Sequence, residues 1–297
     1  MILDPTQVSP WQNCLSGENA FYNKENYLEA TKEDFSQGKS LPVSYTWNTE
    51  SKILRIAKLI FSIIIFPVGI YKLIHSLVGK VLLPASSPSR MGLPANYANN
   101  ARQQVNLNGD WKYKRLTIEV DGYKIDATIM GKEATFDNGR WTLLSNGNGE
   151  FAEEGHMASG NFIKILSEVN SNGIVFNYPG VGSSSGLPNR EAMAKVYRAM
   201  LNFLEDKEKG IGAKEIIGYG HSIGGGAQGD ALRTHDLKKN VKYVFVKSRT
   251  FSDLSTEASL LVNKPAGFLL KIFGWNMGSV ESSKNLKAPE IIMHMPI

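Results

Sequence analysis

The chain has 297 residues, of which 42% are hydrophobic and 21% are charged, a composition that allows one large globular domain and an extension. Its formal net charge is +5 at pH 7, but the basic residues form no dense cluster interleaved with aromatics, which argues against a nucleic-acid partner. The single cysteine, Cys14, excludes a disulfide framework and a zinc site with paired thiolates, and the sequence carries no metal or cofactor motif.

The first part of the chain is polar and aperiodic. Residues 1–50 are rich in Asn, Ser, Glu and Lys and are interrupted by prolines, which predicts an irregular amino-terminal arm. Residues 1–20 contain no apolar h-region, so no secretory signal peptide is expected. Residues 84–108 are rich in Pro, Ser, Asn and Ala and are interpreted as a linker.

Residues 51–83, between the arm and the linker, form an apolar helical segment. Its longest uncharged stretch, Leu59–Tyr71, is shorter than the roughly 20 residues that a membrane-spanning helix needs. Pro67 and Gly69 predict a kink or break. Basic residues flank the stretch, so residues 53–83 are expected to form a helical hairpin or an interfacial helix on a membrane surface. The alternative is an apolar helix pair packed on a domain, and the localisation is accordingly cytoplasmic-face membrane or cytoplasm.

From residue 109 to residue 297 the sequence alternates strand-like and helix-like segments. Trp111–Val120 and Tyr123–Met130 are strand-like and are joined by Asp121-Gly122, a strong hairpin signal. The following pattern predicts a mostly parallel sheet with helices on both faces. The expected strands are Trp141–Leu144, Gly173–Tyr178, Glu215–Gly220, Val241–Val246 and Pro289–Met295, and the expected helices are Phe162–Val169, Glu191–Leu204 and Ile223 to about His235.

A serine motif stands between one of these strands and the next helix. Gly220-His221-Ser222-Ile223-Gly224 has the G-x-S-x-G pattern, which is weak alone but strong where a strand turns sharply into a helix. The turn strains the serine backbone and presents its hydroxyl beside the helix N-terminus, which stabilises developing negative charge. Ser222 is therefore the predicted nucleophile, and a plain Gly/Ser-rich turn is the alternative.

A second loop fits an oxyanion hole for this serine. Where such an elbow is catalytic, one oxyanion donor is the amide of the residue after the nucleophile, here Ile223. The other comes from the loop after an earlier strand, where Asn146-Gly147-Asn148-Gly149 stands. We expect the amide of Asn148 to be this donor, with the amide of Gly149 as the alternative. An Asn-Gly turn without a ligand also fits the pattern.

These motifs resemble those of the α/β-hydrolase superfamily over roughly residues 110–297. The Asn146–Gly149 loop is similar to the His-Gly-Asn-Ala loop of many membrane-associated serine hydrolases, with Asn146 in place of the histidine. Asn177–Ser184 and Arg249–Leu254 resemble the segments after their fourth and sixth strands. The chlamydial CHLPS family is the nearest resemblance, since it also covers the apolar stretch around Phe66-Pro67-Val68-Gly69. The resemblance implies an α/β-hydrolase sheet that lacks its last strand, and it implies no particular substrate.

The catalytic acid and histidine are the missing parts of the motif set. In this superfamily they follow the seventh and eighth strands, and Pro289–Met295 fits the seventh strand while the sequence stops at Ile297. Either the chain is a fragment, or it keeps the scaffold without the chemistry. The first explanation is the more economical, because a sheet ending there exposes a parallel edge. Asp253, after the sixth strand, is an alternative acid, although a helix N-cap or turn is its more ordinary role.

None of the five histidines has the position expected of a general base. His75 is expected at the polar edge of the apolar segment, and His235 at the solvent-facing end of a helix. His221 is expected to point away from the nucleophile. His156 follows the oxyanion loop and is a candidate pocket residue, whereas His294 is expected within the last strand.

The leading prediction is a serine hydrolase acting on an ester, thioester or amide whose acyl group is small or lipid-like. Residues 255–285 lie where lids are commonly inserted in this fold and carry many apolar residues. The second prediction is a catalytically inactive, membrane-associated adaptor on the same scaffold. Nucleotide binding at residues 180–186 is disfavoured, because the G-x-G-x-x-x-G spacing is one residue too long and follows the wrong strand.

Overall fold

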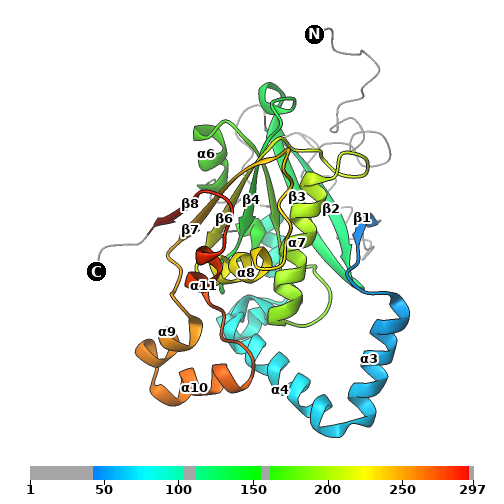
Figure 1. Ribbon diagram of the computed structural model, residues 1–297, viewed down its shortest axis with the longest axis vertical. Helices are drawn as coiled ribbons and strands as arrows, with labels where there is room; N and C mark the ends of the chain where they lie inside the picture. Colours follow the sequence, from blue (N-terminus) through cyan, green and yellow to red (C-terminus); the bar gives the residue numbers. More distant parts are fainter. Residues whose placement is uncertain (1–42, 104–110, 155–160, 294–297) are drawn as a thin grey trace.

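A single mixed sheet organises the part of the chain that the structure describes, which comprises residues 43–103, 111–154 and 161–293 of a computed structural model. Its strand order is β1-β2-β3-β5-β4-β6-β7-β8 (Figure 1). The strands are β1 (Val43–Trp47), β2 (Trp111–Val120), β3 (Tyr123–Lys132), β4 (Arg140–Ser145), β5 (Asn172–Phe176), β6 (Glu215–His221), β7 (Lys242–Ser248) and β8 (Glu290–Met293).

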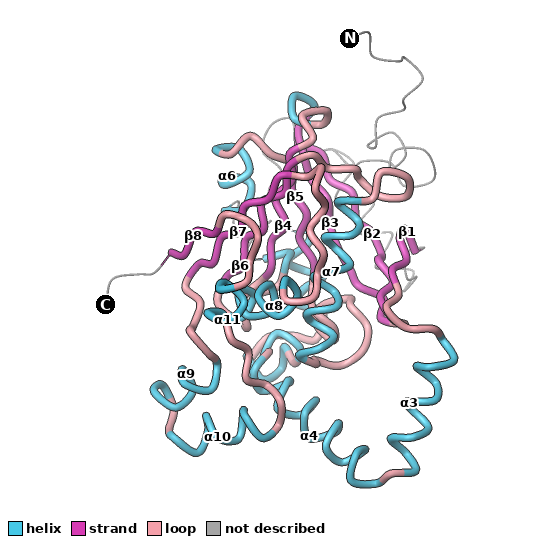
Figure 2. Tube along the Cα trace, viewed as in Figure 1, coloured by secondary structure: helices cyan, strands magenta, loops and turns pink. Residues whose placement is uncertain are grey.

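The strands lie side by side in one sheet (Figure 2). The edge strand β1 pairs in parallel with β2, whereas the β2–β3 and β3–β5 pairs are antiparallel. β2 and β3 form a hairpin whose turn residues, Asp121 and Gly122, have φ angles of 48° and 90°. Positive φ at both positions is what a tight hairpin turn requires, which is why this dipeptide predicted the turn. β3 pairs with β5 antiparallel, and β5, β4, β6, β7 and β8 then follow in parallel.

Helices cover both faces of the parallel part, because successive strand residues point to opposite sides. In β5, Ile174 and Phe176 belong to the larger core, and Val175 belongs to the smaller one. Helices α7 (Arg190–Glu205) and α8 (Ile223–Leu232) contribute to the larger core, and α6 (Asn161–Glu168) contributes to the smaller one. This arrangement confirms the predicted fold class: a mostly parallel sheet with helices on both faces.

Two helical pairs lie at the end of the molecule where β6 passes into α8 (Figure 1). The first is α3 (Lys52–Ile64) with α4 (Phe66–Leu82), and the second is α9 (Leu254–Leu261) with α10 (Lys264–Ile272). Within the described residues, no single helix has both the length and the apolar composition needed to cross a membrane. The α3–α4 pair meets that test only when taken together, with a bend of 105°.

The structure differs from the sequence-based expectation in two places. The part of the expected irregular arm that is described contains β1, which pairs with β2. The expected linker contains the short helices η1 (Pro84–Ser86), η2 (Pro88–Met91) and α5 (Tyr97–Gln103), and Ala85, Ala98 and Ala101 are buried there. Small apolar residues are sufficient for packing here, whereas composition alone indicated a linker. The short helix α11 (Ser279–Lys284) precedes β8.

Candidate active site

Ser222 lies at the turn between β6 and α8 in a strained backbone conformation, with φ 52° and ψ −120°. Its amide donates to the carbonyl oxygen of Ser248 (2.9 Å), and its own carbonyl oxygen accepts from the Thr250 hydroxyl (3.0 Å). These bonds to the end of β7 and the segment after it hold the strained turn, and Ser222 remains partly exposed. The strand–turn–helix context that the motif requires is therefore present.

The two glycines of the motif make this turn sterically possible. A Cβ atom on Gly220 would lie 2.5 Å from Gln228 Oε1 and 2.7 Å from Gly225 Cα. A Cβ atom on Gly224 would lie 2.2 Å from the carbonyl oxygen of Ser145. Real Cβ atoms do not approach other atoms so closely, so α8 can begin against β4 only because both positions lack a side chain.

The predicted oxyanion loop lies directly against this elbow. A Cβ atom added to Gly224 would lie 2.7 Å from the carbonyl oxygen of Asn146. A Cβ atom added to Gly147 would lie 3.1 Å from His221 Cδ2. Ile223 is buried as the first residue of α8, and Asn148 is exposed in the turn that follows β4. The structure thus brings the Asn146–Gly147 backbone next to the residues that flank Ser222.

A carboxylate that the sequence analysis did not single out is part of this loop. Glu150 Oε2 accepts the Gly147 amide at 2.6 Å, and Glu150 Oε1 lies 3.6 Å from His221 Nε2. Backbone amides next to glycines attract an anion. Glu150 follows Gly147 by three residues, and this acidic residue near the glycines was the sequence signal that could have identified the contact. This pair links the loop to the residue before Ser222.

Tyr178 contacts the same loop through its hydroxyl group. Its hydroxyl donates to the carbonyl oxygen of Asn146 (3.1 Å) and lies 2.6 Å from the Ser145 hydroxyl, which in turn donates to the carbonyl oxygen of Gly224 (3.2 Å). Burial raises the pKa of Tyr178 far above its usual value, so the phenol stays protonated. A chain of buried hydrogen bonds therefore connects β4, the loop and α8.

Asp253, the alternative acid, is the N-cap of α9. Its side chain accepts from the Thr256 amide at 2.8 Å and from the Ser255 hydroxyl at 2.6 Å. Burial raises the pKa of Asp253, but the hydrogen bonds from Ser255 and Thr256 outweigh it, and the pKa lies below its usual value. The carboxylate is thus ionised and engaged in capping, as expected for its more ordinary role.

Each histidine that the structure describes engages a partner other than Ser222. His75 is buried and its Nδ1 donates to the carbonyl oxygen of Phe273 at 2.6 Å, while burial lowers its pKa. His235 is also buried, with its Nε2 2.8 Å from Glu205 Oε1. The solvent-facing position predicted for His235 is therefore wrong, because a carboxylate distant in sequence binds it. His156 and His294 lie outside the described residues.

A cavity of about 780 Å³ opens between α4, α7 and the end of α8, away from the serine turn. It carries five basic and two acidic side chains, and its basic character was not evident from the sequence. It is lined by Val68, Tyr71, Lys72, His75, Asn189, Arg190, Glu191, Ala194, Lys195, Arg198, Asp230, Arg233, Thr234 and Gly274.

The sheet order and the strand–helix turn at Ser222 define an α/β-hydrolase fold. An α/β-hydrolase from Vibrio vulnificus matches 86% of this chain and 80% of its own, with 16% identity and a TM-score of 0.55. The chain is also similar to the Pyrococcus furiosus esterase Pf2001, with 16% identity, coverage of 61% of this chain and 67% of that one, and a TM-score of 0.44. It is similar to an acetyl xylan esterase from Paenibacillus sp. R4 as well, with 12% identity, coverage of 66% of this chain and 75% of that one, and a TM-score of 0.45. At these identities the likeness concerns the fold.

The family model described as Chlamydia CHLPS protein (DUF818) matches residues 28–296. The chain therefore belongs to this family, and the resemblance found in the sequence is confirmed. The match spans the apolar helices as well as the sheet domain, so the family model covers both. No curated protein matches the chain.

Proposed function

We propose that this chain is a serine hydrolase in which Ser222 attacks the acyl carbon of an ester, thioester or amide. The strained backbone of Ser222 carries the proposal, because a non-glycine residue keeps such a conformation mainly where function uses it. The fold of the chain, shared with an α/β-hydrolase, supports the same class of reaction.

In the proposed reaction, the Ser222 oxygen bonds to the acyl carbon as its proton passes to a base, and the carbonyl oxygen becomes an oxyanion. The amides of Ile223 and Asn148, or Gly149 in its place, would donate to that oxygen. Collapse of the intermediate expels the protonated leaving group, and water then releases the acid from the acyl-enzyme. The contacts of the Asn146–Gly147 backbone with the elbow support this pairing of loop and helix.

A covalent serine-directed fluorophosphonate probe tests the proposal on the full chain. We expect labelling of the parent protein and none of Ser222→Ala. Ser252→Ala is the matched control, because Ser252 is an exposed serine after β7 whose side chain has no described hydrogen bond. Labelling that persists in Ser222→Ala, or disappears in Ser252→Ala, would contradict the assignment of the nucleophile.

A catalytically inactive adaptor on this scaffold is the second candidate, and one observation favours it. His75, His221 and His235 contact Phe273, Glu150 and Glu205, and Glu150 already accepts an amide of the predicted oxyanion loop. An adaptor predicts a folded protein that the probe does not label at all. Circular dichroism of the unlabelled sample distinguishes this outcome from misfolding.

A further inference from the structure

Helix α4 has one exposed apolar face and one buried face. Phe66, Ile70, Leu73, Leu77 and Val81 recur at three- and four-residue spacing and are 40–72% exposed. The opposite side of the helix contains His75 and Gly79, which are buried against the rest of the protein. Five large apolar side chains in one exposed row are unusual for a surface that faces only water.

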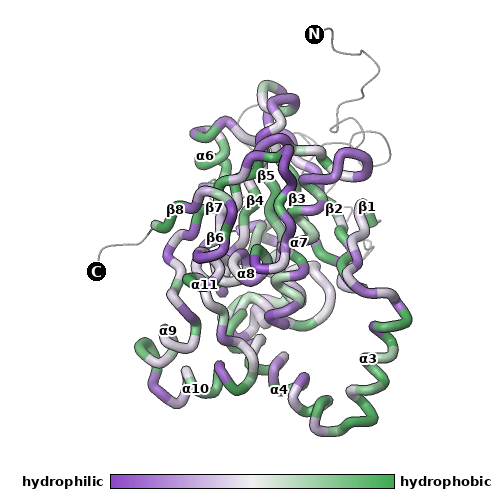
Figure 3. Tube along the Cα trace, in the orientation of Figure 1, coloured by the Kyte–Doolittle hydropathy of each residue, from purple (hydrophilic) through white to green (hydrophobic). Residues whose placement is uncertain are grey.

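Helix α3 reverses the ordinary pattern of burial. Its buried residue is Ser62, whereas Ile53 is 81% exposed and Ile63 and Ile64 are each 71% exposed. Figure 3 shows apolar residues along the whole of this helix, which extends away from the sheet. Because burying an apolar side chain is favourable, an apolar environment would stabilise this arrangement.

The second helical pair presents the same kind of surface. Leu260, Leu261 and Val262 at the end of α9 are 70–77% exposed, and Phe268 in α10 is 63% exposed. The opposite side of α10 is buried at Gly267 and Leu270. This pair is inserted between β7 and β8, so it lies far from α3 and α4 in sequence.

The two pairs are nevertheless joined. His75 in α4 donates to the carbonyl oxygen of Phe273 at the end of α10, and the Trp275 indole donates to the carbonyl oxygen of His75 (2.8 Å). The His75 and Trp275 rings also stack with centroids 4.8 Å apart. Both pairs lie at the end of the sheet that carries Ser222 (Figure 1). They therefore form one continuous structural unit at the candidate active-site end.

The charge of this unit indicates which kind of apolar environment it binds. Helices α3, α4 and α10 contain no acidic residue and α9 contains one, Glu257, and the cavity beside α4 is also predominantly basic. Arg55 and Lys58 pair with Asp121 and Glu50 within the protein. The other basic residues of these helices are Lys52, Lys72, Lys80, Lys264 and Lys271. Lysines and arginines next to exposed apolar side chains favour the headgroup region of an anionic bilayer over a neutral apolar surface.

We propose that α3–α4 and α9–α10 together form one docking surface for an anionic lipid bilayer. The helices lie in the interface and do not span it, because 13 and 17 residues extend only about 20–26 Å, less than the ~30 Å of hydrocarbon. Docking places the Ser222 end of the sheet toward the lipid. The further step, that the acyl substrate is delivered from the bilayer, rests on the proposed function.

Vesicle flotation tests the surface with the full chain, using phosphatidylcholine vesicles with and without phosphatidylglycerol. The single variants Phe66→Glu and Phe268→Glu, one in each helical pair, are each expected to reduce binding to anionic vesicles by on the order of tenfold. Val280→Glu is the matched control: it makes the same kind of change at a 49% exposed apolar position in α11 and is expected to bind like the parent. Raising the salt concentration is expected to weaken binding to the anionic vesicles.

The charge requirement has its own pair of variants. Lys264→Gln with Lys271→Gln is expected to weaken binding to anionic vesicles, whereas Lys207→Gln, after the far end of α7, is expected to leave it unchanged. All measurements are repeated in Ser222→Ala, so that vesicle binding is scored whether or not the chain has hydrolase activity. Absence of hydrolysis by the parent protein, together with intact vesicle binding, would contradict the proposed function and leave the docking surface standing.

Three results would overturn the inference. One is binding that Phe66→Glu abolishes and Phe268→Glu does not affect, since the two pairs would not then form one surface. Another is equal binding to neutral and anionic vesicles. A third is absence of vesicle binding together with a dimer that Phe66→Glu dissociates in size-exclusion chromatography with light scattering, which would assign the apolar face to a second copy of the chain.

Discussion

At the residue scale, Gly224 has the least room for a side chain among the glycines of the serine turn. A Cβ atom there would lie 2.2 Å from the carbonyl oxygen of Ser145, and backbone atoms cannot move aside as a flexible side chain can. We expect Gly224→Ala to destabilise the fold by about 3 kcal/mol, because either α8 or the end of β4 must shift. The midpoint of urea unfolding measures the loss, and fluorophosphonate labelling of Ser222 is expected to slow with it.

Gly149→Ala is the matched control for this substitution. A Cβ atom on Gly149 has Met91 Cε as its nearest neighbour at 3.7 Å, which is an ordinary contact, and alanine keeps the backbone amide. Its stability is expected to change by less than about 0.5 kcal/mol. Equal losses in the two glycine variants would show that the steric argument at Gly224 is mistaken.

The environment of a single residue could be predicted from the sequence when its partners are close to it along the chain. The Ser222 turn could be predicted because its strand, glycines and helix are contiguous, and the structure forms that turn. The burial of His235 could not be predicted, because Glu205 lies 30 residues away and binds only after α7 and the segment after α8 have packed. Tyr178 is a similar case, since its partners are in β4 and the loop that follows.

At the scale of an element, the N-cap of α9 separates two roles for Asp253. Asp253→Ala removes the acceptor for the Thr256 amide and is expected to destabilise the protein by about 1 kcal/mol. Asp253→Asn keeps an N-cap acceptor and is expected to be as stable as the parent. If Asp253 only caps the helix, both variants retain hydrolase activity. A loss of roughly 10⁴-fold in Asp253→Asn would instead assign it as the catalytic acid.

Element boundaries were predictable where one period extends over a whole segment. The expected strand Trp111–Val120 has the same bounds in the structure, and the expected helix Glu191–Leu204 is α7. β1 was not predictable, because its five residues in a polar context are too few to show a hydrophobic alternation. Its pairing partner, β2, also lies more than 60 residues later in the sequence. The 105° bend between α3 and α4 falls at Ile65, just before the proline that indicated a break.

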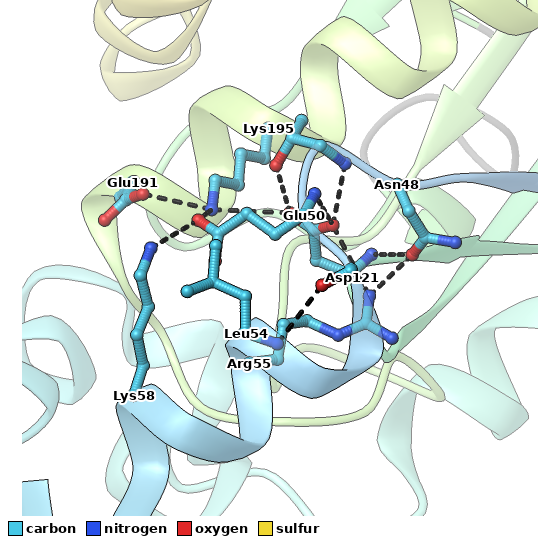
Figure 4. A network of polar contacts seen from close by, with 10 residues as sticks. Asn48, Glu50, Leu54, Arg55, Lys58, Asp121, Glu191 and Lys195 are labelled. Carbon is cyan, nitrogen blue, oxygen red and sulfur yellow. Dashed lines mark hydrogen bonds and ion pairs between the residues drawn. The ribbon is translucent and has the colours of Figure 1, made fainter. Parts of the chain in front are cut away.

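At the scale of the whole molecule, Asp121 attaches the first helical pair to the sheet. Its carboxylate accepts from the Thr49 amide (2.8 Å) and lies 3.4 Å from Arg55 and 3.3 Å from Lys195 (Figure 4). Burial raises the pKa of Asp121, but hydrogen bonds from Thr49 and Glu50 and the charge of Lys195 outweigh it, and the pKa is lowered. The β2–β3 turn, the start of α3 and α7 thus meet at one ionised carboxylate.

Acid should weaken this attachment. A carboxyl group whose pKa is lower in the folded state stabilises fully above its unfolded pKa of about 3.9, and the stabilisation is lost as the pH falls through the folded value. Asp121→Asn, which suits the turn before Gly122, is expected to lower stability by about 2 kcal/mol at pH 7 and to reduce the acid dependence below pH ~4. Urea unfolding from pH 7 to pH 3 measures both. Glu208→Gln, at an exposed carboxyl, should retain the parent's acid dependence.

Local stability is expected to divide the molecule into a protected sheet and an exposed α3. The residues of β4 are buried between two cores, whereas nearly all of α3 is exposed and its tertiary packing is mainly on α4. Isolated helices shorter than about 12–15 residues are marginal in water, so α3 should open often. Hydrogen exchange measured by mass spectrometry is expected to be fast in α3 and slow in β4 and in α7, which is a helix of similar length but largely buried. Anionic vesicles should slow exchange in α3 and leave α7 unchanged. If α3 exchanged as slowly as α7 in water alone, its apolar residues would already have a partner in solution, and the bilayer would not be needed to account for them.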